Sequence, residues 1–442
     1  MELSAGDTAW VLTAAALVLL MTPGVAFFYG GMVRSKSVLN MMMMSFLAIA
    51  IVSILWVAFG YSLAFGDGGN GFVGDFSAAG LSDLVGKLAD NGGTYPIPAL
   101  AFAMFQLMFA IITVALISGA VADRMKFLAW IIFAAAWATL VYFPVAHWVF
   151  DFGGTELGGP GAGWLANLGV LDFAGGTAVH INAGAAGLAL VVVMGKRVGF
   201  GKVPMRPHNL PFVIMGASLL YFGWFGFNAG SALGANDLAA VAFTNTMVAT
   251  AAAILGWLIV EKLRDGHATS LGAASGAVAG LVAITPACAF VTPGGAIAVG
   301  AIAGIICAFA VTLKYRLGYD DSLDVVGVHM VGGIIGCLLI GFFATTSVNS
   351  LGKDGLFYGG GLSVLWTQAI GAGAVLAYSF IVTLILAFIL KATVKLRVSQ
   401  DDEIGGIDLA VHAEGAYELG DTGGGGVFAG VGHAARNSAE EN

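Results

Sequence analysis

The sequence predicts an all-α protein that crosses a membrane many times. Of its 442 residues, 59% are hydrophobic and only 10% are charged, with a mean hydropathy of +0.92. A soluble domain carries about 25% charged residues, so this composition excludes an ordinary soluble protein. Two histidines, His180 and His329, interrupt long apolar stretches. An ionisable side chain at bilayer depth usually faces an interior path, which favours a role in moving something across the membrane.

Eleven apolar stretches of spanning length follow one another along the chain. A membrane-crossing helix needs about 20 predominantly apolar residues. The predicted spans are residues 8–33, 38–66, 97–121, 126–149, 174–195, 210–230, 239–261, 270–290, 293–315, 325–346 and 361–390. No basic segment precedes the first stretch, which is also too long for a signal peptide, so it is expected to be a retained helix.

Lysine and arginine predict the orientation of these spans. Sixteen of the 18 basic residues fall in alternate loops or after the last span, and only Lys87 and Lys353 fall on the opposite side. Cytoplasmic loops carry an excess of basic residues, so the N-terminus is predicted outside and the C-terminus in the cytoplasm. The net charge of −8 gives no reason to expect a nucleic acid partner.

The odd number of spans permits an inverted repeat within a membrane domain of residues 1–390. Spans one to five and six to ten form halves of about residues 1–195 and 196–346, and a last helix of about 361–390 follows. Because five is odd, the second half enters the membrane inverted relative to the first. Inverted repeats place their substrate site near the midplane, between the halves.

The two histidines occupy matching positions of these halves, on spans five and ten. Each is followed by glycines four and seven residues later: Gly184, Gly187, Gly333 and Gly336. On a helix such glycines permit close packing or line a narrow lumen. A lone histidine is more often packed against a backbone carbonyl, but a matched pair favours a shared lumen, in which adjacent imidazoles can share a proton.

Neither a metal nor a cofactor is expected. Two imidazoles without a nearby Glu or Cys are a poor ligand set. Cys288, Cys307 and Cys337 lie in apolar segments without zinc or disulfide spacing and are predicted to pack. The absence of HExxH, Walker and TVGYG patterns argues against a metalloprotease, an ATP-driven pump and a potassium-type channel.

Aromatic and small polar residues gather toward the outer ends of two spans. The sixth span ends YFGWFGFNAGSA, with Trp224, Phe227 and Ser231, and the third contains FQLMF, with Phe109. Interfacial belts of Trp and Tyr occur on any membrane protein. Phenylalanines and a serine among small residues suit a vestibule better, and a cage of rings attracts a cation by about 0.5–2 kcal/mol.

Three further polar residues lie in or beside the spans. Asp172 begins the fifth span and is predicted to cap its helix rather than to contact a substrate, although its charge favours a nearby cation. Ser275 and Thr285 on the eighth span are candidates for hydrogen bonds between helices.

Five segments spread in order over the membrane portion resemble the ammonium transporter (Amt/Rh/Mep) family, in its bacterial Amt branch. They are TPGVAFFYGGMVRSKSVLN, DFAGGTAVHINAG, GWFGFNAGSA, ITPACAF and DVVGVHMVGG. The resemblance implies a multi-pass protein of the cell membrane that serves nitrogen uptake and is not an enzyme. It also implies a homotrimer of eleven-helix subunits in the lipid bilayer, each subunit with its own hydrophobic pore.

The resemblance also implies roles for individual residues. His180 and His329 resemble the twin histidines of the pore, and Phe109 and Phe227 the stacked phenylalanine gate. Ser231 is similar to the hydrogen-bonding serine of an outer ammonium site. Supporting roles are implied for Trp224, which resembles a pore-side tryptophan, and for Asp172 near the outer site.

The chain departs from the family pattern in HWVF. Family members commonly have a tryptophan of the outer cage where Phe150 stands, and a longer loop containing Trp164 follows here. Either Phe150 serves in its place, with weaker cation–π attraction, or Trp164 folds back into the site.

The expected function is channel-like transport of ammonium or ammonia. Carrying the charge through an apolar pore costs too much, whereas desolvation lowers the pKa of an amine from about 10.4 by several units. Ammonium is therefore expected to deprotonate at the gate, and its proton either returns outside or follows the histidines. The alternative is an ammonium sensor of the same fold that signals through its tail.

The tail, residues 391–442, is polar and then glycine-rich, and its last twenty or so residues are expected to be disordered. Its earlier part is expected either to fold against the cytoplasmic face or to bind a partner. That part resembles the tail through which the family is regulated, often by PII-type signalling proteins.

Overall fold

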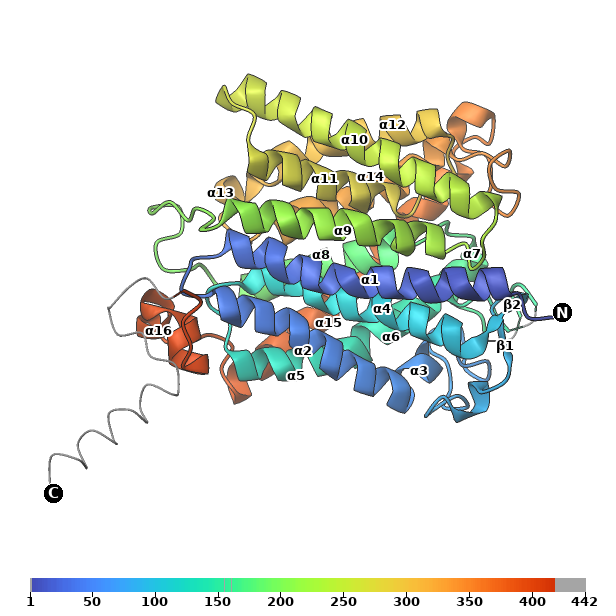
Figure 1. Ribbon diagram of the computed structural model, residues 1–442, viewed down its shortest axis with the longest axis horizontal. Helices are drawn as coiled ribbons and strands as arrows, with labels where there is room; N and C mark the ends of the chain where they lie inside the picture. The colour runs from blue at the N-terminus through green and yellow to red at the C-terminus, as the bar shows by residue number, and fades with distance from the viewer. Residues whose placement is uncertain (1, 155, 160, 418–442) are drawn as a thin grey trace, which may run out of the picture.

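Long helices lie side by side and make up most of the molecule (Figure 1). The computed structural model describes residues 2–154, 156–159 and 161–417. Within these residues, ten apolar helical segments are long enough to cross a membrane. An eleventh, α11 (Ser270–Ile284), is apolar but has only 15 residues.

The ten segments follow the predicted spans to within a few residues. In chain order they are α1 (Ala5–Met32); α2 (Val38–Leu55) with η1 (Trp56–Gly60) and α3 (Tyr61–Phe65); α4 (Ala99–Ile117) with η3 (Ser118–Val121); α5 (Phe127–Trp137) with η4 (Ala138–Tyr142) and α6 (Phe143–Phe150); η5 (Gly176–Ile181) with α8 (Asn182–Met194); α9 (Leu210–Gly230); α10 (Asp237–Asp265); α12 (Pro293–Ala310) with α13 (Leu313–Leu317); η6 (Val326–Met330) with α14 (Val331–Phe343); and α15 (Ser363–Thr393).

The predicted span 270–290 was wrong at its C-terminal boundary. Helix α11 ends at Ile284, because Pro286 has no amide hydrogen to continue the helical ladder. The chain beyond it makes tight turns instead, in which the amides of Ala287 and Phe290 bond the carbonyls three residues earlier, each at 2.9 Å.

Short elements cover the two ends of the bundle. One end, called here the hairpin end, carries η2 (Ser82–Leu84) and an antiparallel hairpin of β1 (Leu88–Asp90) and β2 (Thr94–Pro98), in which Asp90 pairs with Thr94. The sequence analysis did not predict this hairpin. The remaining short elements are α7 (Trp164–Leu168), η7 (Leu356–Tyr358), α16 (Gln400–Gly405) and η8 (Asp408–His412).

The opposite end, called here the basic end, is held by buried ion pairs between loops. Arg197, after α8, contacts Asp320 at 2.8 Å and Asp123 at 3.2 Å, and Arg124 donates to the Asp320 carbonyl at 2.6 Å. Burial alone would raise the pKa of Asp320, but hydrogen bonds and charge from Arg197 and Arg124 hold it below its ordinary value. The network joins segments from both halves of the chain.

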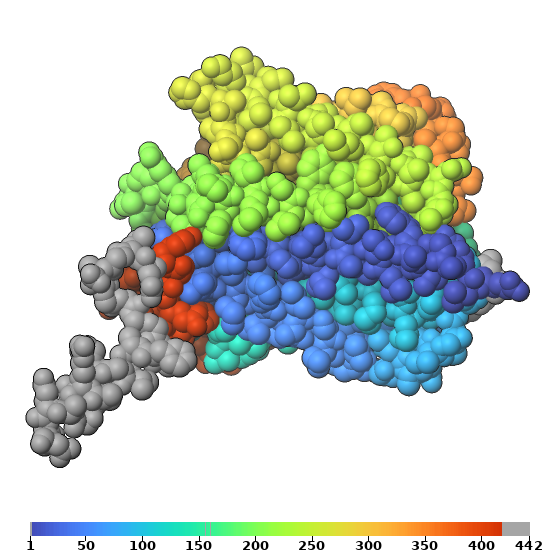
Figure 2. Space-filling view, viewed as in Figure 1, coloured from blue at the N-terminus to red at the C-terminus, as the bar shows by residue number. Residues whose placement is uncertain are grey.

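The start of the tail folds onto the basic end, as one of the two sequence-based expectations proposed. Glu403 is fully buried and accepts hydrogen bonds from Arg397 at 2.6 Å and from the Val198 amide at 2.7 Å. Asp408 accepts from the amides that begin α2, those of Leu39 and Asn40. The space-filling view shows the start of the tail, in red, beside the N-terminal helices, in blue (Figure 2). The residues expected to be disordered lie outside the described part of the chain.

Replacing Glu403 with alanine is expected to release α16 from the basic end. The change removes the carboxylate that accepts from Arg397 and from the Val198 amide, although Arg397 keeps its hydrogen bond to the Lys196 carbonyl. Each lost buried bond costs about 1–3 kcal/mol. Hydrogen exchange measures the release as faster exchange at Val198 and over residues 400–412. The exposed neighbour Asp401 provides the matched control. If amide exchange in Glu403→Ala is as slow as in Asp401→Ala, the Glu403 side chain does not hold α16 at the basic end.

Candidate functional site

The two histidines of the sequence analysis meet in the core. His180 lies in η5 and His329 in η6, and both segments are π-helical turns. Their Nδ1 atoms are 3.3 Å apart and their rings are nearly parallel, with centroids separated by 5.4 Å. Two like nitrogens can bond only if one donates and the other accepts, so the pair shares a single proton between these atoms. Such wide turns are frequent at functional sites.

A buried carboxylate begins each π-helical turn. Asp172 accepts hydrogen bonds, each of 2.7 Å, from the amides of Gly175, Gly176 and Thr177. Asp321 accepts two from the start of η6, at 3.1 and 2.7 Å. Asp172 thus caps its helix as predicted, whereas the sequence analysis missed Asp321. The signal was visible, because each aspartate stands eight residues before its histidine in DFAGGTAVH and DSLDVVGVH.

The paired glycines bring the two turns into contact. A Cβ on Gly184 would lie 2.5 Å from the backbone nitrogen of Met330, beside His329. A Cβ on Gly333 would lie 2.9 Å from the Gly176 carbonyl oxygen and 3.2 Å from the His180 Cβ. Each half therefore supplies the glycine on which the other half's histidine turn rests, which confirms the predicted close packing.

Gly184→Ala is expected to lower the thermal stability of the protein. The added methyl group clashes with backbone atoms of Met330, which cannot move away as a flexible side chain could. Overpacking of this kind lowers the free energy of unfolding by about 1–3 kcal/mol. Thermal unfolding in detergent measures the loss. Gly373 is the matched control, because it lies within α15 with no atom within 4 Å of its added Cβ. Gly373→Ala should leave the midpoint unchanged or raise it, and an equal loss in both variants would refute the contact.

Two stacked phenylalanines lie next to the histidines. The rings of Phe109 and Phe227 are 4.1 Å apart and nearly parallel, and both side chains are buried. Phe227 is followed by the His180 ring at 6.2 Å, and Phe150 stands edge-on to Phe109 at 6.3 Å. Together with His329 they form a continuous sequence of rings, the ring column. The structure thus brings both predicted gate residues and both histidines together.

The structure separates the two candidates for the outer position. Phe150 stands beside the stacked phenylalanines, and the side chain of Asn91, from the hairpin, holds its carbonyl at 2.8 Å. Trp164 packs instead against Phe72 and Trp148, with centroids 6.1 and 5.6 Å away. Phe150 is therefore the candidate that the fold places on the ring column.

Of the remaining predicted residues, Trp224, Thr285 and Ser231 are connected to the ring column by contacts, whereas Ser275 is not. Trp224 lies parallel to the His180 ring at 5.3 Å, and its indole donates to the Thr285 hydroxyl at 2.7 Å. Ser231 lies one helical turn beyond Phe227, and its hydroxyl donates a hydrogen bond to the Phe227 carbonyl at 2.9 Å. Ser275 stands ten residues before Thr285, about 15 Å along a helix, so it lies away from these contacts.

A narrow cavity of about 10 Å³ continues the ring column, with room for about one water-sized molecule. Its lining is apolar apart from the Trp224, Tyr29 and His329 side chains and otherwise consists of Val25, Phe28, Leu116, Leu220 and Val278. Among the described residues, the buried His180 Nε2 has no hydrogen-bond partner. A small neutral molecule with a polar atom fits this environment, whereas an ion would lose its hydration without replacement.

The sequence analysis also missed His147, which is buried behind Phe150. Its Nδ1 lies 3.0 Å from Asp151 and 3.1 Å from the Ala64 carbonyl oxygen, and its Nε2 lies 2.7 Å from the Asn70 carbonyl oxygen. Both ring nitrogens face acceptors, so the doubly protonated ring satisfies every contact. The spacing of His147 and Asp151, one helical turn apart, was the available signal. The pair anchors the chain segment that carries Phe150.

In the described residues, no three His, Cys, Asp or Glu side chains gather as a ligand group. Cys288, Cys307 and Cys337 are buried and unpaired, as expected of packing residues.

The chain is similar over most of its length to known ammonium transporters. The model of the Ammonium Transporter Family matches residues 9–417. An ammonium transporter of Mycobacterium tuberculosis is 58% identical over 433 residues, which cover 94% of this chain and 90% of that protein. The crystal structure of Candida albicans Mep2 has a TM-score of 0.83 at 34% identity, covering 91% of this chain and 88% of that one. A structure described as a Sensor Amt Protein has a TM-score of 0.83 at 29% identity, covering 92% and 98%.

Proposed function

The chain belongs to the ammonium transporter family, and from this membership and the ring column we propose that it is a channel-like transporter that deprotonates ammonium and conducts ammonia. The family consists of membrane transporters rather than enzymes, so ammonium transport is the activity to explain. The observation that carries the mechanism is the histidine pair directly behind two stacked phenylalanines.

Ammonium first binds at the hairpin end, between the rings of Phe150 and Phe109 and the hydroxyl of Ser231. A cation above aromatic rings gains about 0.5–2 kcal/mol. The negative charge of Asp172 behind these rings favours the same cation. Phe150 supplies a phenyl ring where relatives commonly have an indole, and indole is the stronger cation–π partner, so binding here is expected to be weak.

The stacked pair Phe109 and Phe227 then acts as the gate. Its rings exclude water, so ammonium reaches them without its hydration shell. Desolvation favours the neutral form of an amine, and loss of a proton at this point lets ammonia pass the rings. Potassium has no proton to lose and is excluded by the same barrier.

Behind the gate, ammonia meets His180 and His329 and enters the narrow cavity. The free Nε2 of His180 offers a polar contact before the cavity, and the His329 side chain lines the cavity itself. The released proton has two routes. It either returns to the outside, which gives net ammonia flux, or it passes along the shared Nδ1 contact, which gives net ammonium flux.

The arrangement in the membrane belongs to the same proposal. The basic end faces the cytoplasm and the hairpin end the outside of the cell membrane, because cytoplasmic loops are the basic ones. Eleven helices cross the bilayer, with α11 as the short eighth. The halves form an inverted repeat, supported by the matched aspartates, histidines and glycines of η5 and η6. Three copies assemble as a homotrimer, each with its own pore.

Transport by the purified protein in liposomes tests the proposed function. An ammonium pulse should produce either a current or internal alkalinisation above that of empty liposomes, and a potassium pulse of equal size should produce neither. Potassium flux comparable to ammonium flux would overturn the deprotonation scheme. A current identifies the histidine route for the proton, and alkalinisation without current identifies the outside route.

A sensor role is the second candidate, favoured by the similarity to a Sensor Amt Protein and by the folded start of the tail. In that case the tail signals ammonium occupancy, and a PII-type signalling protein is a candidate partner for it. The same liposome experiment separates the two roles, because a pure receptor shows neither current nor alkalinisation.

A further inference from the structure

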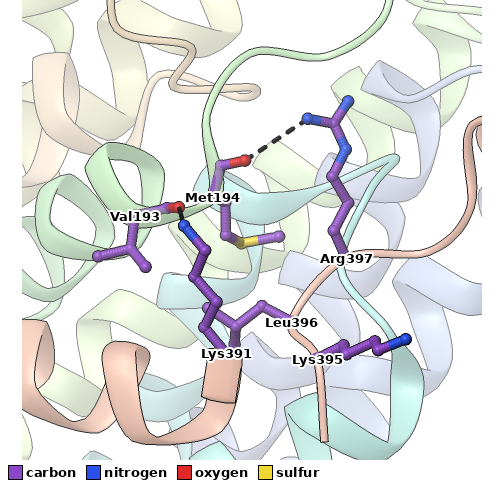
Figure 3. A pocket seen from close by; sticks show the side chains of 6 residues that line it. All are labelled: Val193, Met194, Lys391, Lys395, Leu396 and Arg397. Atoms are coloured by element: carbon purple, nitrogen blue, oxygen red, sulfur yellow. Dashed lines mark hydrogen bonds between the residues drawn. The ribbon is translucent and has the colours of Figure 1, made fainter.

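A second cavity, of about 350 Å³, lies at the basic end between the last turns of α8 and α15 (Figure 3). Small-ligand sites have volumes of roughly 300–1,000 Å³, so its size fits a small ligand. Its lining contains three cationic side chains and no carboxylate: Val193, Met194, Lys391, Lys395, Leu396 and Arg397. The cavity takes no part in the ring column.

The two lysines leave the cavity positively charged. Arg397 is neutralised by Glu403 at 2.6 Å, whereas neither lysine forms an ion pair within the described part of the chain. Lys391 donates one hydrogen bond, to the Val193 carbonyl at 3.3 Å, and an ammonium group has three donors. Figure 3 shows Lys391 and Arg397 reaching the last carbonyls of α8, while Lys395 extends in another direction. An anion is the complementary ligand.

Exposed apolar side chains lie just before the cavity lining along both helices. Val192 on α8 and Phe388 and Ile389 on α15 are 57%, 55% and 53% exposed, and they precede the lining residues by one to three positions. On helices that cross a membrane, such side chains contact acyl chains. The cavity then opens at the depth of the lipid headgroups, where juxtamembrane lysines attract anionic lipids.

We propose that Lys391 binds the phosphate group of an anionic phospholipid from the leaflet at the basic end, and that Lys395, which extends in another direction, adds its positive charge at the same cavity. The lipid's acyl chains lie along Val192, Phe388 and Ile389. A zwitterionic phospholipid carries the same phosphate with a compensating cation and binds less tightly. Free phosphate shares the phosphate chemistry but gains nothing from the apolar side chains.

Native mass spectrometry of the full chain in detergent tests the site with three probes. These are phosphatidylglycerol, phosphatidylcholine with the same acyl chains, and inorganic phosphate. The test variant is the double change Lys391→Ala with Lys395→Ala. The matched control is Lys262→Ala, because Lys262 is also exposed at the end of a spanning helix and bonds a backbone carbonyl, that of Gly266 at 2.9 Å. Thermal unfolding confirms that each variant folds.

The proposal expects phosphatidylglycerol to bind more tightly than phosphatidylcholine. Each lysine near the surface is worth about a fivefold difference, so the double variant weakens binding about 25-fold. Lys262→Ala should bind as the unaltered protein does. If inorganic phosphate displaces the lipid at equal concentration, the ligand of the site is free phosphate rather than a phospholipid, and the proposal is overturned. Equal binding by the double variant, or an equal loss in Lys262→Ala, would reduce the effect to general surface charge and overturn the site.

Discussion

Replacing Asp172 with alanine is expected to cause the largest loss of stability of any single change at the candidate site. The carboxylate accepts three backbone hydrogen bonds of 2.7 Å at the start of η5. Alanine leaves these buried amides without an acceptor, and each unsatisfied donor costs about 1–3 kcal/mol. The negative charge also stabilises the positive end of the helix. Together these losses amount to at least about 3 kcal/mol.

Thermal unfolding in detergent and the yield of folded protein measure this loss. Asp172→Asn keeps one acceptor oxygen and should fall between alanine and the unaltered chain. Asp83, an exposed carboxylate at the hairpin end, provides the control, and Asp83→Ala should unfold at the original temperature. If Asp172→Ala unfolds like Asp83→Ala, the carboxylate is not what holds η5.

The second large effect is expected on charge transport, from His180→Ala. The change removes the nitrogen that faces His329 Nδ1 at 3.3 Å and the free Nε2. If the proton follows the histidines, this gap interrupts the proposed path, and the ammonium-dependent current in liposomes should fall more than tenfold. Neutral ammonia does not need the proton path, so its remaining flux should appear as internal alkalinisation without a current.

Thr244→Ala is the control for this measurement. Thr244 is exposed on α10 and bonds its own helix, so its current should match that of the unaltered protein. A His180→Ala current equal to that of Thr244→Ala would show that the charge takes another route. A potassium current in His180→Ala would instead show that the pair contributes to ion exclusion.

The sequence predicted the helical spans well because each is a continuous apolar run between loops that carry charge or proline. It failed where local pattern does not decide the structure. Pro286 shortened α11, although the apolar run continues to residue 290. The hairpin of β1 and β2 is short and interrupted by glycine and proline, so neither a helical nor a strand period is visible there. The fold of the tail depends in part on the hydrogen bond between Glu403 and the Val198 amide, which lie 205 residues apart in the sequence.

The candidate site was predictable in part for similar reasons. His180 and His329 stand out because they interrupt apolar spans at matched positions. Asp321 was missed although its spacing to His329 matches that of Asp172 to His180, because the second aspartate, Asp324, lies between it and the histidine. His147 was missed because two of its three partners are backbone carbonyls, which leave no trace in a sequence. The π-helical shape of η5 and η6 likewise depends on buried carboxylates and on contacts between the halves.

The mutual packing of Gly184 and Gly333 has a consequence for biosynthesis. Each histidine turn rests on a glycine of the other half, so neither half of the chain contains a finished passage. Spanning helices enter the bilayer one after another as the chain is made, and His329 is among the last to arrive. The passage therefore forms only when the tenth span closes onto the fifth. If the chain functions as proposed, a partly synthesised chain therefore has no continuous path across the bilayer.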